Sequence, residues 1–353
     1  MTTVHVVVPD GIDDPTRPSG GNRYDRKICG ELAATGWDVR VLVAPGGWPR
    51  PDAAALSGLG RTIGALPDGA LVVLDGLIAS AAASVLVAAS GRLRQVILVH
   101  MPLGDVAVPA EAESAVLRHA RAVVTTSSWT RERLLDRYPL RPDRVQVARP
   151  GAESGELATG SPGGGRFLCV GAVVPEKGQD LLLDALRGIA DRPWTCTVVG
   201  SLDRSPALVR RLRRQAADLG FADRISFPGP RVGAELTHEY RTADLLIHPS
   251  RLESYGMVLT EALGYGLPVV ATAVGGVPEA LGRTAEGVPG LLVPPDDAGA
   301  LGGALRAWLG DPLLRSRLRR QARARRASLE GWDATARRLA ATLVAAGETA
   351  ALS

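Results

Sequence analysis

The chain has 353 residues, more than one hydrophobic core usually organises, so two domains of about 150 to 200 residues each are expected. Hydrophobic residues make up 46% of the chain and charged residues 22%, which excludes a disordered, fibrous or disulfide-stapled class. The net charge of +4 rests almost wholly on arginine, because Lys27 and Lys177 are the only lysines. We interpret this imbalance as codon bias in a GC-rich genome.

No targeting or membrane-spanning segment is predicted. Residues 1–9 lack a basic start followed by a long apolar stretch and a small-residue cleavage site, so the chain is expected to stay in the cytoplasm. The most apolar stretch, 71–89, is interrupted by Asp75 and Gly76, which predicts a strand, a turn and a helix in place of a membrane span.

The cysteines predict neither a disulfide framework nor a metal site. Cys29, Cys169 and Cys196 are odd in number and lie far apart along the chain. This arrangement is typical of reduced structural thiols.

Two arginine clusters stand out, Arg210 to Arg214 and the run from Arg315 through Arg326. Either would attract phosphate, nucleic acid or anionic lipid, but a solvated helix face is the commoner origin of such a run. Neither cluster contains the interleaved aromatic residues that single-stranded nucleic acid needs, so no nucleic-acid partner is predicted. A weak peripheral membrane contact through the arginine-rich run stays open.

Short apolar runs rich in β-branched residues alternate with helical stretches along the whole chain. The first series of runs is 4–8, 39–43, 71–74, 96–99, 122–125 and 145–147, and the second is 167–170, 196–199, 225–227, 245–247, 268–271 and 291–293. Such alternation predicts βα units that feed a parallel sheet. The chain is therefore expected to be α/β, with two Rossmann-like, doubly wound domains.

The expected domain boundaries follow from composition. Residues 1–154 form the first domain, and residues 166–330 form the second. Between them, 155–165 is so rich in Gly, Pro and small polar residues that we expect an unpacked linker. The segment 331–353 carries apolar residues at helical spacing and is expected to form an amphipathic helix.

Ligands in doubly wound sheets bind at the carboxyl ends of the strands. Two such domains joined by one linker are expected to turn these ends toward a shared central cleft, where the chemistry should be sought.

The richest chemical signal is the stretch from His248 to Glu261, which follows one predicted strand and precedes the next. Gly256 marks the expected start of a helix, so Glu253 lies in the loop before it and Glu261 lies one to two turns inside it. Free amides at a helix start favour an anion such as phosphate. The two glutamates are therefore expected to have different roles.

Glutamate, seven residues, then glutamate within such a loop and helix resembles the retaining glycosyltransferases of the GT-B fold, usually called family 4. The resemblance implies that Glu253 contacts hydroxyls of the transferred sugar and Glu261 the ribose hydroxyls of the nucleotide. It also implies nucleotide contacts at the helix start, at Tyr255, Gly256, Met257 and Val258.

Other matches to this family extend along almost the whole chain. Ser19-Gly20-Gly21-Asn22 is similar to its N-terminal glycine-rich loop, where missing side chains let phosphates and acceptor approach the backbone. His100 resembles the strand-end histidine that meets the donor sugar. The resemblance further assigns donor contacts to Lys177, Arg231 and Val232, and the 331–353 helix is similar to one that crosses back onto the first domain.

The phosphate clamp departs from the family pattern. The family has Gly-Arg, a few residues, then Lys-Gly, whereas this chain has Ala172 in the arginine position and keeps Lys177 before Gly178. Loss of an unreplaced donor to the leaving diphosphate costs roughly a hundredfold in rate. Arg204, in the next predicted loop, is a possible substitute.

The resemblance implies transfer of a hexose-like sugar from a nucleotide diphosphate donor with retention at the anomeric carbon, by front-face attack and without a carboxylate nucleophile. No Asp-X-Asp triplet occurs in the chain, so neither a metal nor a cofactor beyond the donor sugar nucleotide is expected. The resemblance also implies that the first domain, 1–154, lies on the acceptor side and the second, 166–330, binds the donor. The expected acceptor is a small metabolite, a saccharide or a lipid, and the sequence leaves monomer and dimer open.

Other readings stay open at this point. A sugar-nucleotide epimerase has the same two-domain plan, and loss of the arginine at position 172 would suit a nucleotide-sugar-binding protein with weakened catalysis. A nicotinamide dehydrogenase is disfavoured because no Gly-X-Gly-X-X-Gly follows the first strand. Singly, His100 could be a rim histidine and Lys177 a solvated loop lysine; their order along the chain is more specific than either residue.

Overall fold

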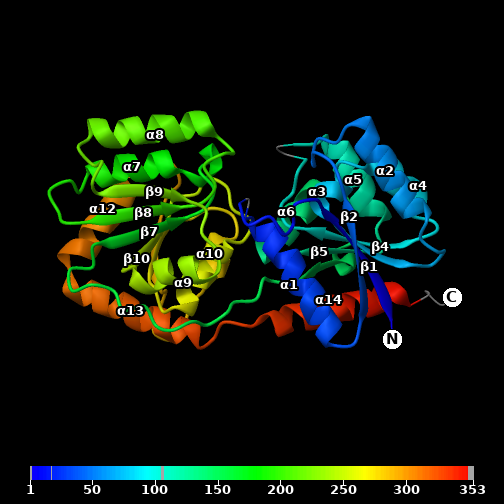
Figure 1. The fold of residues 1–353 in the computed structure, drawn as a ribbon. Helices are drawn as coiled ribbons and strands as arrows, with labels where there is room; N and C mark the ends of the chain where they lie inside the picture. The colour runs from blue at the N-terminus through cyan, green and yellow to red at the C-terminus, as the bar shows by residue number, and fades with distance from the viewer. Residues whose placement is uncertain (1, 17, 105–106, 349–353) are drawn as a thin grey trace. The chain divides into compact units, whose positions relative to one another are not determined.

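The computed structural model describes residues 2–16, 18–104 and 107–348. Residues 1, 17, 105–106 and 349–353, which belong to the predicted first domain and the predicted terminal helix, lie outside the described residues. The chain divides into two compact units, which are considered separately (Figure 1). Unit 1 comprises Met1–Asp13, Ser19–Gly151 and Glu330–Ser353, and unit 2 comprises Asp14–Pro18 and Ala152–Leu329.

Unit 1 contains a six-stranded parallel sheet in the order β2-β1-β3-β4-β5-β6. Its strands are β1 (Thr3–Pro9), β2 (Asp38–Ala44), β3 (Leu71–Asp75), β4 (Arg94–Val99), β5 (Ala122–Thr125) and β6 (Val145–Val147). Its helices are α1 (Gly20–Ala34), α2 (Ala53–Gly64), α3 (Gly76–Ala79), α4 (Ala83–Ala89), α5 (Ala110–His119), α6 (Ser128–Arg137), the 3-10 turn η1 (Pro142–Arg144) and α14 (Trp332–Gly347).

Helices cover both faces of this sheet. Helices α1 and α14 pack against each other on one face, and α2, α4 and α5 lie together on the other (Figure 1). The terminal helix α14 thus completes unit 1, although it follows unit 2 in sequence. Its Thr335 hydroxyl donates to the Arg149 carbonyl, and an added side chain on Gly151 would collide with the Trp332 backbone. Glycine at 151 is what lets the two segments touch.

Unit 2 contains a second six-stranded parallel sheet, in the order β12-β11-β10-β7-β8-β9. Its strands are β7 (Arg166–Val170), β8 (Thr195–Val199), β9 (Ile225–Gly229), β10 (Leu245–His248), β11 (Val269–Thr272) and β12 (Gly290–Val293). Its helices are the 3-10 turn η2 (Pro175–Lys177), α7 (Gln179–Arg187), α8 (Pro206–Asp218), α9 (Gly233–Thr242), α10 (Met257–Gly264), α11 (Val277–Leu281), α12 (Ala298–Gly310) and α13 (Pro312–Arg326).

The central strands are mainly apolar because both faces of the sheet are covered there, whereas the edge strand β2 carries Asp38 and Arg40 and is partly exposed. In β7, Phe167 and Cys169 enter the core beneath α7, α8 and α12, while the intervening Leu168 enters the core beneath α9 and α10. Each of the twelve runs predicted from sequence overlaps an observed strand. The predicted α/β class with two doubly wound parallel sheets is therefore confirmed. Within the residues that the structure covers, no helix combines the length and apolarity needed to cross a membrane.

The predicted unpacked linker is wrong in one respect, because 155–165 packs along unit 2. The amides of Ala158 and Thr159 donate to the carbonyls of Tyr265 and Arg241. Small residues permit this close approach: a Cβ on Gly155 would lie 2.1 Å from the Tyr265 ring. The low side-chain volume that suggested a loose tether in fact lets the backbone lie flat on its neighbours.

The arginine-rich run is also not a simple solvated helix face. Several of its guanidinium groups bind protein groups: Arg315 donates to the carbonyls of Trp308 and Leu309, Arg319 to Asp244, Arg320 to Glu286, Arg325 to the Leu281 carbonyl, and Arg326 to the carbonyls of Gly155 and Gly264. Helix α13 therefore ties the 155–161 segment to unit 2, since a planar guanidinium can serve several acceptors at once.

Asp244 is the centre of this attachment. Its carboxylate, fully buried, accepts from the Ser161 amide, the Ser161 hydroxyl, the Arg166 amide and the Arg319 guanidinium. The preceding Ala243 closes α9, and Asp244 leads directly into β10. The Asp244 carboxylate thus joins the 155–165 segment, the start of strand β7 and helix α13.

We expect Asp244→Ala to lower the free energy of unfolding by about 3 kcal/mol, because it leaves buried amides without an acceptor and a guanidinium without its partner. Chemical denaturation would measure the change. Arg320→Met is the matched control, because the Arg320–Glu286 pair is solvent-exposed and is expected to contribute far less. Equal losses in the two variants would contradict the anchoring role of Asp244.

Candidate functional site

The order of strands in each sheet identifies where a ligand site is expected. In doubly wound sheets, ligands bind beyond the carboxyl ends of the strands at the point where the strand order reverses. In unit 2 this point lies between the paired strands β7 and β10, and in unit 1 it lies between β1 and β3. Charged side chains gather at both points.

At the unit 2 point, three predicted or neighbouring side chains converge. Lys177 ends the turn after β7, His248 ends β10, and Glu253 lies in the loop that follows β10. The Lys177 Nζ atom lies 2.6 Å from Glu253 Oε2, and His248 Nε2 lies 3.1 Å from the same oxygen. The structure thus brings the predicted Lys177 and Glu253 into direct contact.

The charge state of Glu253 follows from these partners. Burial by itself would raise the pKa of this carboxyl, but Lys177 and His248 outweigh it and hold the pKa well below its usual range. Burial lowers the pKa of His248, so the ring is neutral at neutral pH and donates its Nε2 hydrogen to Glu253. Glu253 is therefore a fixed carboxylate with one oxygen, Oε2, taken by two donors.

The start of α10 lies just beyond Glu253. Gly256 has φ of +98°, a left-handed conformation that glycine adopts without strain. Helix α10 then begins at Met257 without a side-chain cap, and its first amides, including those of Met257 and Val258, point out of the helix start. Tyr255 is buried beneath this turn. The helix start lies where the sequence predicted it, and the amides of its first turn would favour a bound anion.

Glu261 has different partners from Glu253. It lies on α10, where its Oε2 accepts from the Tyr240 hydroxyl at 2.8 Å, and the Tyr240 ring stacks on Tyr265 with centroids 5.2 Å apart. Aromatic packing thus fixes the donor that orients Glu261. The two glutamates are held by separate groups, as expected for separate roles.

Arg231 and Val232 follow β9, at the same carboxyl edge of the sheet. Arg231 Nη1 lies 3.1 Å from Glu239 Oε1, and Val232 precedes α9 in an extended conformation with 43% of its surface exposed. The structure therefore places Arg231 in an ion pair with α9, while Val232 presents an open surface.

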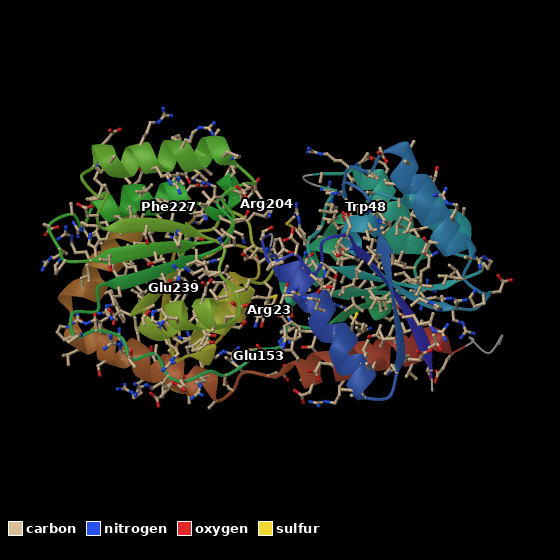
Figure 2. All side chains as sticks on the ribbon, in the orientation of Figure 1. Arg23, Trp48, Glu153, Arg204, Phe227 and Glu239 are labelled. Carbon is tan, nitrogen blue, oxygen red and sulfur yellow. The ribbon has the colours of Figure 1, made fainter. Side chains whose placement is uncertain are left out.

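The loop with Ala172 lies against the loop that carries Arg204. An added Cβ on Gly200 would lie 2.8 Å from the Ala172 amide, so the loops after β7 and β8 touch through their backbones. Arg204 is exposed four residues beyond Gly200 (Figure 2). Gln179 donates to the Ala172 carbonyl at 3.0 Å.

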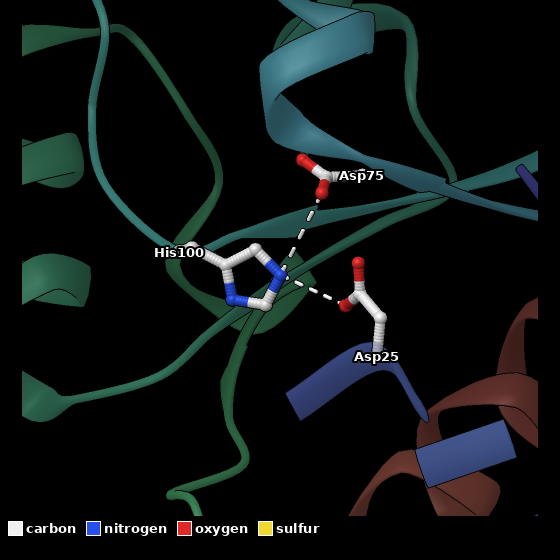
Figure 3. Close-up of side chains that lie close together, drawn as sticks. All are labelled: Asp25, Asp75 and His100. Carbon is white, nitrogen blue, oxygen red and sulfur yellow. Dashed lines mark hydrogen bonds and ion pairs between the residues drawn. The ribbon is translucent and has the colours of Figure 1, made fainter. Parts of the chain in front are cut away.

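In unit 1, His100 follows β4 and meets two carboxylates (Figure 3). Its Nε2 atom lies 2.8 Å from Asp25 Oδ1 on α1 and 3.9 Å from Asp75 Oδ2 at the end of β3. Gly20 and Gly21 open α1, and a Cβ on Gly21 would lie 3.3 Å from the His100 ring. The predicted glycine pair and histidine are thus neighbours at the unit 1 reversal point.

The unit 1 cluster holds extra protons. Burial alone would lower the pKa of His100, but the Asp25 and Asp75 carboxylates outweigh it and raise that pKa to about 9. Burial, together with the nearby Asp25 charge, raises the pKa of Asp75 to about 7. His100 is therefore an imidazolium at neutral pH, with Nδ1 as its second donor.

Sequence reasoning missed Asp25, Asp75 and His248. Asp75 and His248 are each the last residue of a buried strand, and Asp25 lies in the first turns of the helix after β1. The rule that ligands meet carboxyl ends of strands would have singled out the two strand-end residues. Asp25 needs the strand order as well, which sequence periodicity does not supply.

Asp25, Asp75 and His100 also offer the donor set for a metal ion. Across the described ranges they form the one group found, with one donor atom from each within 4.8 Å of the others. Two carboxylates and an imidazole suit several divalent cations. The sequence predicted no metal site, so chelation is tested below.

Comparison with known proteins finds one family model that matches part of the chain. Residues 161–325 match the family model described as "Glycosyl transferases group 1". The D-inositol 3-phosphate glycosyltransferase of Frankia alni is 37% identical over 247 residues, which cover 64% of this chain and 59% of that protein. That of Acidothermus cellulolyticus is 35% identical over 254 residues, covering 66% and 55%. The chain thus spans less than two thirds of the length of these curated relatives.

Solved structures share the whole fold. Sucrose-phosphate synthase from Thermosynechococcus elongatus has a TM-score of 0.78 at 22% identity and covers 97% of this chain and 98% of that one. Anabaena HepE in complex with UDP and glucose has a TM-score of 0.78 at 20% identity, with 98% and 100% covered. The chain therefore has the GT-B fold, and its residues 161–325 match the group 1 glycosyltransferases.

Proposed function

We propose that this chain is a retaining hexosyltransferase that uses a nucleotide diphosphate sugar, with its donor site at the unit 2 reversal point. The observation that carries the proposal is the contact of Lys177 and His248 with Glu253 beside the uncapped start of α10. A fixed carboxylate next to a cation and free amides suits a ligand that combines hydroxyls with a diphosphate.

Each group at this site then has a distinct role. Glu253 keeps its Oε1 oxygen available to accept from a sugar hydroxyl, because its Oε2 oxygen already has two donors. Lys177 and the α10 amides face the diphosphate and stabilise the negative charge that grows as the leaving group departs. Glu261 binds the ribose, held in place by Tyr240.

The two glutamates do not form a glycosidase pair. Glu253 is an ionised carboxylate and Glu261 is anchored to a different partner, so neither is set up as an acid opposite a nucleophile. Retention is instead proposed to follow front-face attack, in which the departing phosphate takes the acceptor proton. The positive charge developing on the sugar would be stabilised electrostatically by these groups.

We assign His100 a supporting role in unit 1. As an imidazolium held by Asp25, it presents Nδ1 as a donor to a hydroxyl or phosphate oxygen of the bound substrates. The glycine pair that opens α1 leaves room for such a ligand beside the ring.

The names of the relatives suggest the acceptor to try first. The curated proteins matched here are D-inositol 3-phosphate glycosyltransferases, so a phosphorylated cyclitol heads the acceptor panel, followed by saccharides and lipids. Because the chain spans under two thirds of those proteins, this acceptor is a proposal to be tested directly. A cytoplasmic location is part of the same proposal.

The epimerase alternative is decided by product analysis. An epimerase would convert the donor without an acceptor, whereas a transferase needs the acceptor to form its glycoside. Donor binding without turnover on the whole acceptor panel would instead favour a binding protein in which Ala172 has weakened catalysis.

We expect one class of nucleotide sugar, among UDP-glucose, GDP-mannose and ADP-glucose, to raise the melting temperature of the protein. Ligand at a hundred times its dissociation constant stabilises the native state by about 2.7 kcal/mol. Lys177→Met is expected to reduce this shift and to lower kcat by about a hundredfold, because it removes a donor to the leaving diphosphate.

Glu253→Gln should weaken binding of the nucleotide sugar more than binding of the free nucleoside diphosphate, because its proposed contact is with the sugar. The matched control is Glu286→Gln, which changes an exposed carboxylate paired with Arg320. If no nucleotide sugar stabilises the wild-type protein, the donor-site assignment is wrong.

The stability of the protein should fall on the alkaline side as His100 deprotonates. Because the pKa of His100 rises from 6.5 to about 9 on folding, its ion pair with Asp25 stabilises the fold fully below pH 6.5 and is lost as pH rises through about 9. Asp75 loses its proton earlier, near its pKa of about 7. Asp25→Asn should therefore move the later loss to lower pH.

Melting temperatures between about pH 6 and pH 10, with NMR titration of the histidine rings, would measure this shift. The exposed His119 supplies the control His119→Gln, which should leave the profile unchanged. A His100 resonance that titrates near pH 6.5 in the wild type would rule out the proposed imidazolium.

Transfer is expected to survive prolonged treatment with EDTA, because the proposed diphosphate partners are Lys177 and helix amides in place of a metal. Activity and metal content should be measured before and after chelation. Loss of activity that returns with one divalent cation would transfer the role to Asp25, Asp75 and His100, and Asp75→Asn would then abolish the rescue.

A further inference from the structure

The two charged residues of the proposed donor site, Lys177 and Glu253, lie in short segments outside the long helices and strands. Lys177 ends the three-residue 3-10 turn Pro175–Lys177, and Gly178 follows it at φ of +66°. Glu253 lies in the loop between β10 and α10, outside any regular element. The Lys177 amide donates to the Val174 carbonyl within the turn, and the Glu253 carbonyl accepts from the Gly276 amide, so these backbone bonds do not join the two segments to each other. The 2.6 Å contact between the two side chains therefore depends on other contacts between the segments.

Arg251 supplies contacts from the Glu253 loop to the Lys177 turn. Its backbone amide donates to the Glu176 carbonyl at 2.8 Å, and its Nη1 atom donates to the Pro175 carbonyl at 2.8 Å. The same guanidinium binds both carboxylate oxygens of Asp180, at 2.8 and 3.2 Å, in the first turn of α7. Arg251 therefore binds the residues before and after Lys177.

A third segment also binds this guanidinium. Arg251 Nε donates to Asp296 Oδ1 at 2.6 Å, and Asp296 has φ of +54°, a left-handed conformation that is strained for a non-glycine residue. The Asp180 and Asp296 partners raise the pKa of Arg251, and the pKa of Asp180 is lowered by Arg251 against the opposing effect of burial. The loop after β12 is thus tied to the same point.

The two loops also touch backbone to backbone. A Cβ on Gly178 would lie 2.0 Å from the Pro249 carbonyl oxygen, so the turn can reach the loop only with glycine at this position. This contact brings the segments together at one end, and the Arg251 guanidinium fixes them about a second point. Two separated points of attachment restrict rotation of one segment against the other.

We infer that Arg251 is a positioning residue of the donor site, which joins the Lys177 turn to the Glu253 loop and so sets the separation of the two charged groups. The contacts that Arg251 makes do not depend on the proposed function, whereas its effect on catalysis rests on that function. Arg251 itself acts through Lys177 and Glu253, since its own nitrogens are occupied by Pro175, Asp180 and Asp296.

The first test reads Lys177 directly. The chain has only two lysines, so reductive methylation of a Lys27→Arg variant with ¹³C-formaldehyde leaves Lys177 and the terminal amine as the labelled groups. We expect Arg251→Met to shift and broaden the Lys177 signal, because the turn loses the guanidinium contacts with Pro175 and Asp180. Asp180→Asn weakens the two-pronged contact with the Arg251 guanidinium without adding an amine, so its Lys177 signal should lie between those of the Lys27→Arg background and of Arg251→Met.

The matched control is Arg306→Met. Arg306 also binds an aspartate with two nitrogens, Asp191, and a backbone carbonyl, that of Gly188, but on the surface near α12. Its loss removes the same kind of contact from the same unit. The Lys177 signal of this variant should coincide with that of the Lys27→Arg background.

The second test measures binding and turnover. For the nucleotide sugar of the panel that binds the wild type best, Arg251→Met should raise the dissociation constant about tenfold or more, since a small misplacement of positioned groups costs up to a hundredfold. In a Glu253→Gln background the same change should add little, because both act on one contact. Arg306→Met should lower the melting temperature without changing the dissociation constant.

The outcomes separate the inference from the proposed function. If no nucleotide sugar binds the wild type, the donor site is wrong, and the Lys177 signal still decides whether Arg251 positions it. If nucleotide sugar binds but the Lys177 signal and dissociation constant of Arg251→Met match those of Arg306→Met, the inference is overturned. Additive effects of Arg251→Met and Glu253→Gln would also overturn it. Should Arg251→Met fail to fold, Asp180→Asn gives both comparisons and Arg251→Lys gives the comparison of dissociation constants.

Discussion

The Glu253 carboxylate is the constraint on which the unit 2 site depends. A carboxylate with 13% of its side chain exposed loses most of its hydration, and it stays ionised only because Lys177 and His248 replace the lost water with a cation and a hydrogen-bond donor. Removing either partner leaves a buried charge that is no longer compensated. The rest of the site is therefore arranged to keep three groups from two strands in contact.

The strand order makes that arrangement possible. Strand β7 pairs with β10 at the reversal point, so the turn after β7 and the loop after β10 leave the sheet side by side although about 75 residues separate them. Unit 1 has a comparable arrangement at its own reversal point, where His100 contacts carboxylates from α1 and β3. In both units a histidine at a strand end contacts a buried carboxylate, but the two imidazole rings differ in charge. His248 is neutral and donates to an ion pair, whereas His100 is itself the cation.

The sequence predicted the sheets well because both faces of each sheet are covered. Strands buried on both sides are apolar at every position, which produces runs such as 245–247 that stand out from the helices. The start of α10 was also predictable, since Gly256 must adopt a conformation that disfavours other residues. The linker was not, because small residues suit both a free tether and a backbone that lies flat on Tyr265.

The partners of the site residues were beyond sequence reasoning for a different physical reason. Lys177 and Glu253 could be identified by motif, but His248 and Arg251 act through contacts whose existence depends on which strands are neighbours. Asp75 and His100 likewise come together because β3 and β4 are neighbours in the sheet of unit 1, and α1 brings Asp25 to the same point. Apolar periodicity identifies strands and leaves their order open, so it can locate reacting groups while missing the residues that position them.

The alanine at position 172 has a consequence for how the remaining groups must work. Without an arginine there, Lys177 is the side-chain cation that the structure brings to Glu253, and a single flexible ammonium neutralises a diphosphate well only when its position is restricted. The restriction comes from outside the turn, through Gly178 against Pro249 and through the Arg251 contacts to Pro175 and Asp180. One arginine, Arg251, therefore still contributes to the proposed phosphate site, but indirectly. Arg251 holds the turn that carries the lysine, and in the proposed donor site Lys177 and the amides of α10 are the groups that would contact the phosphates.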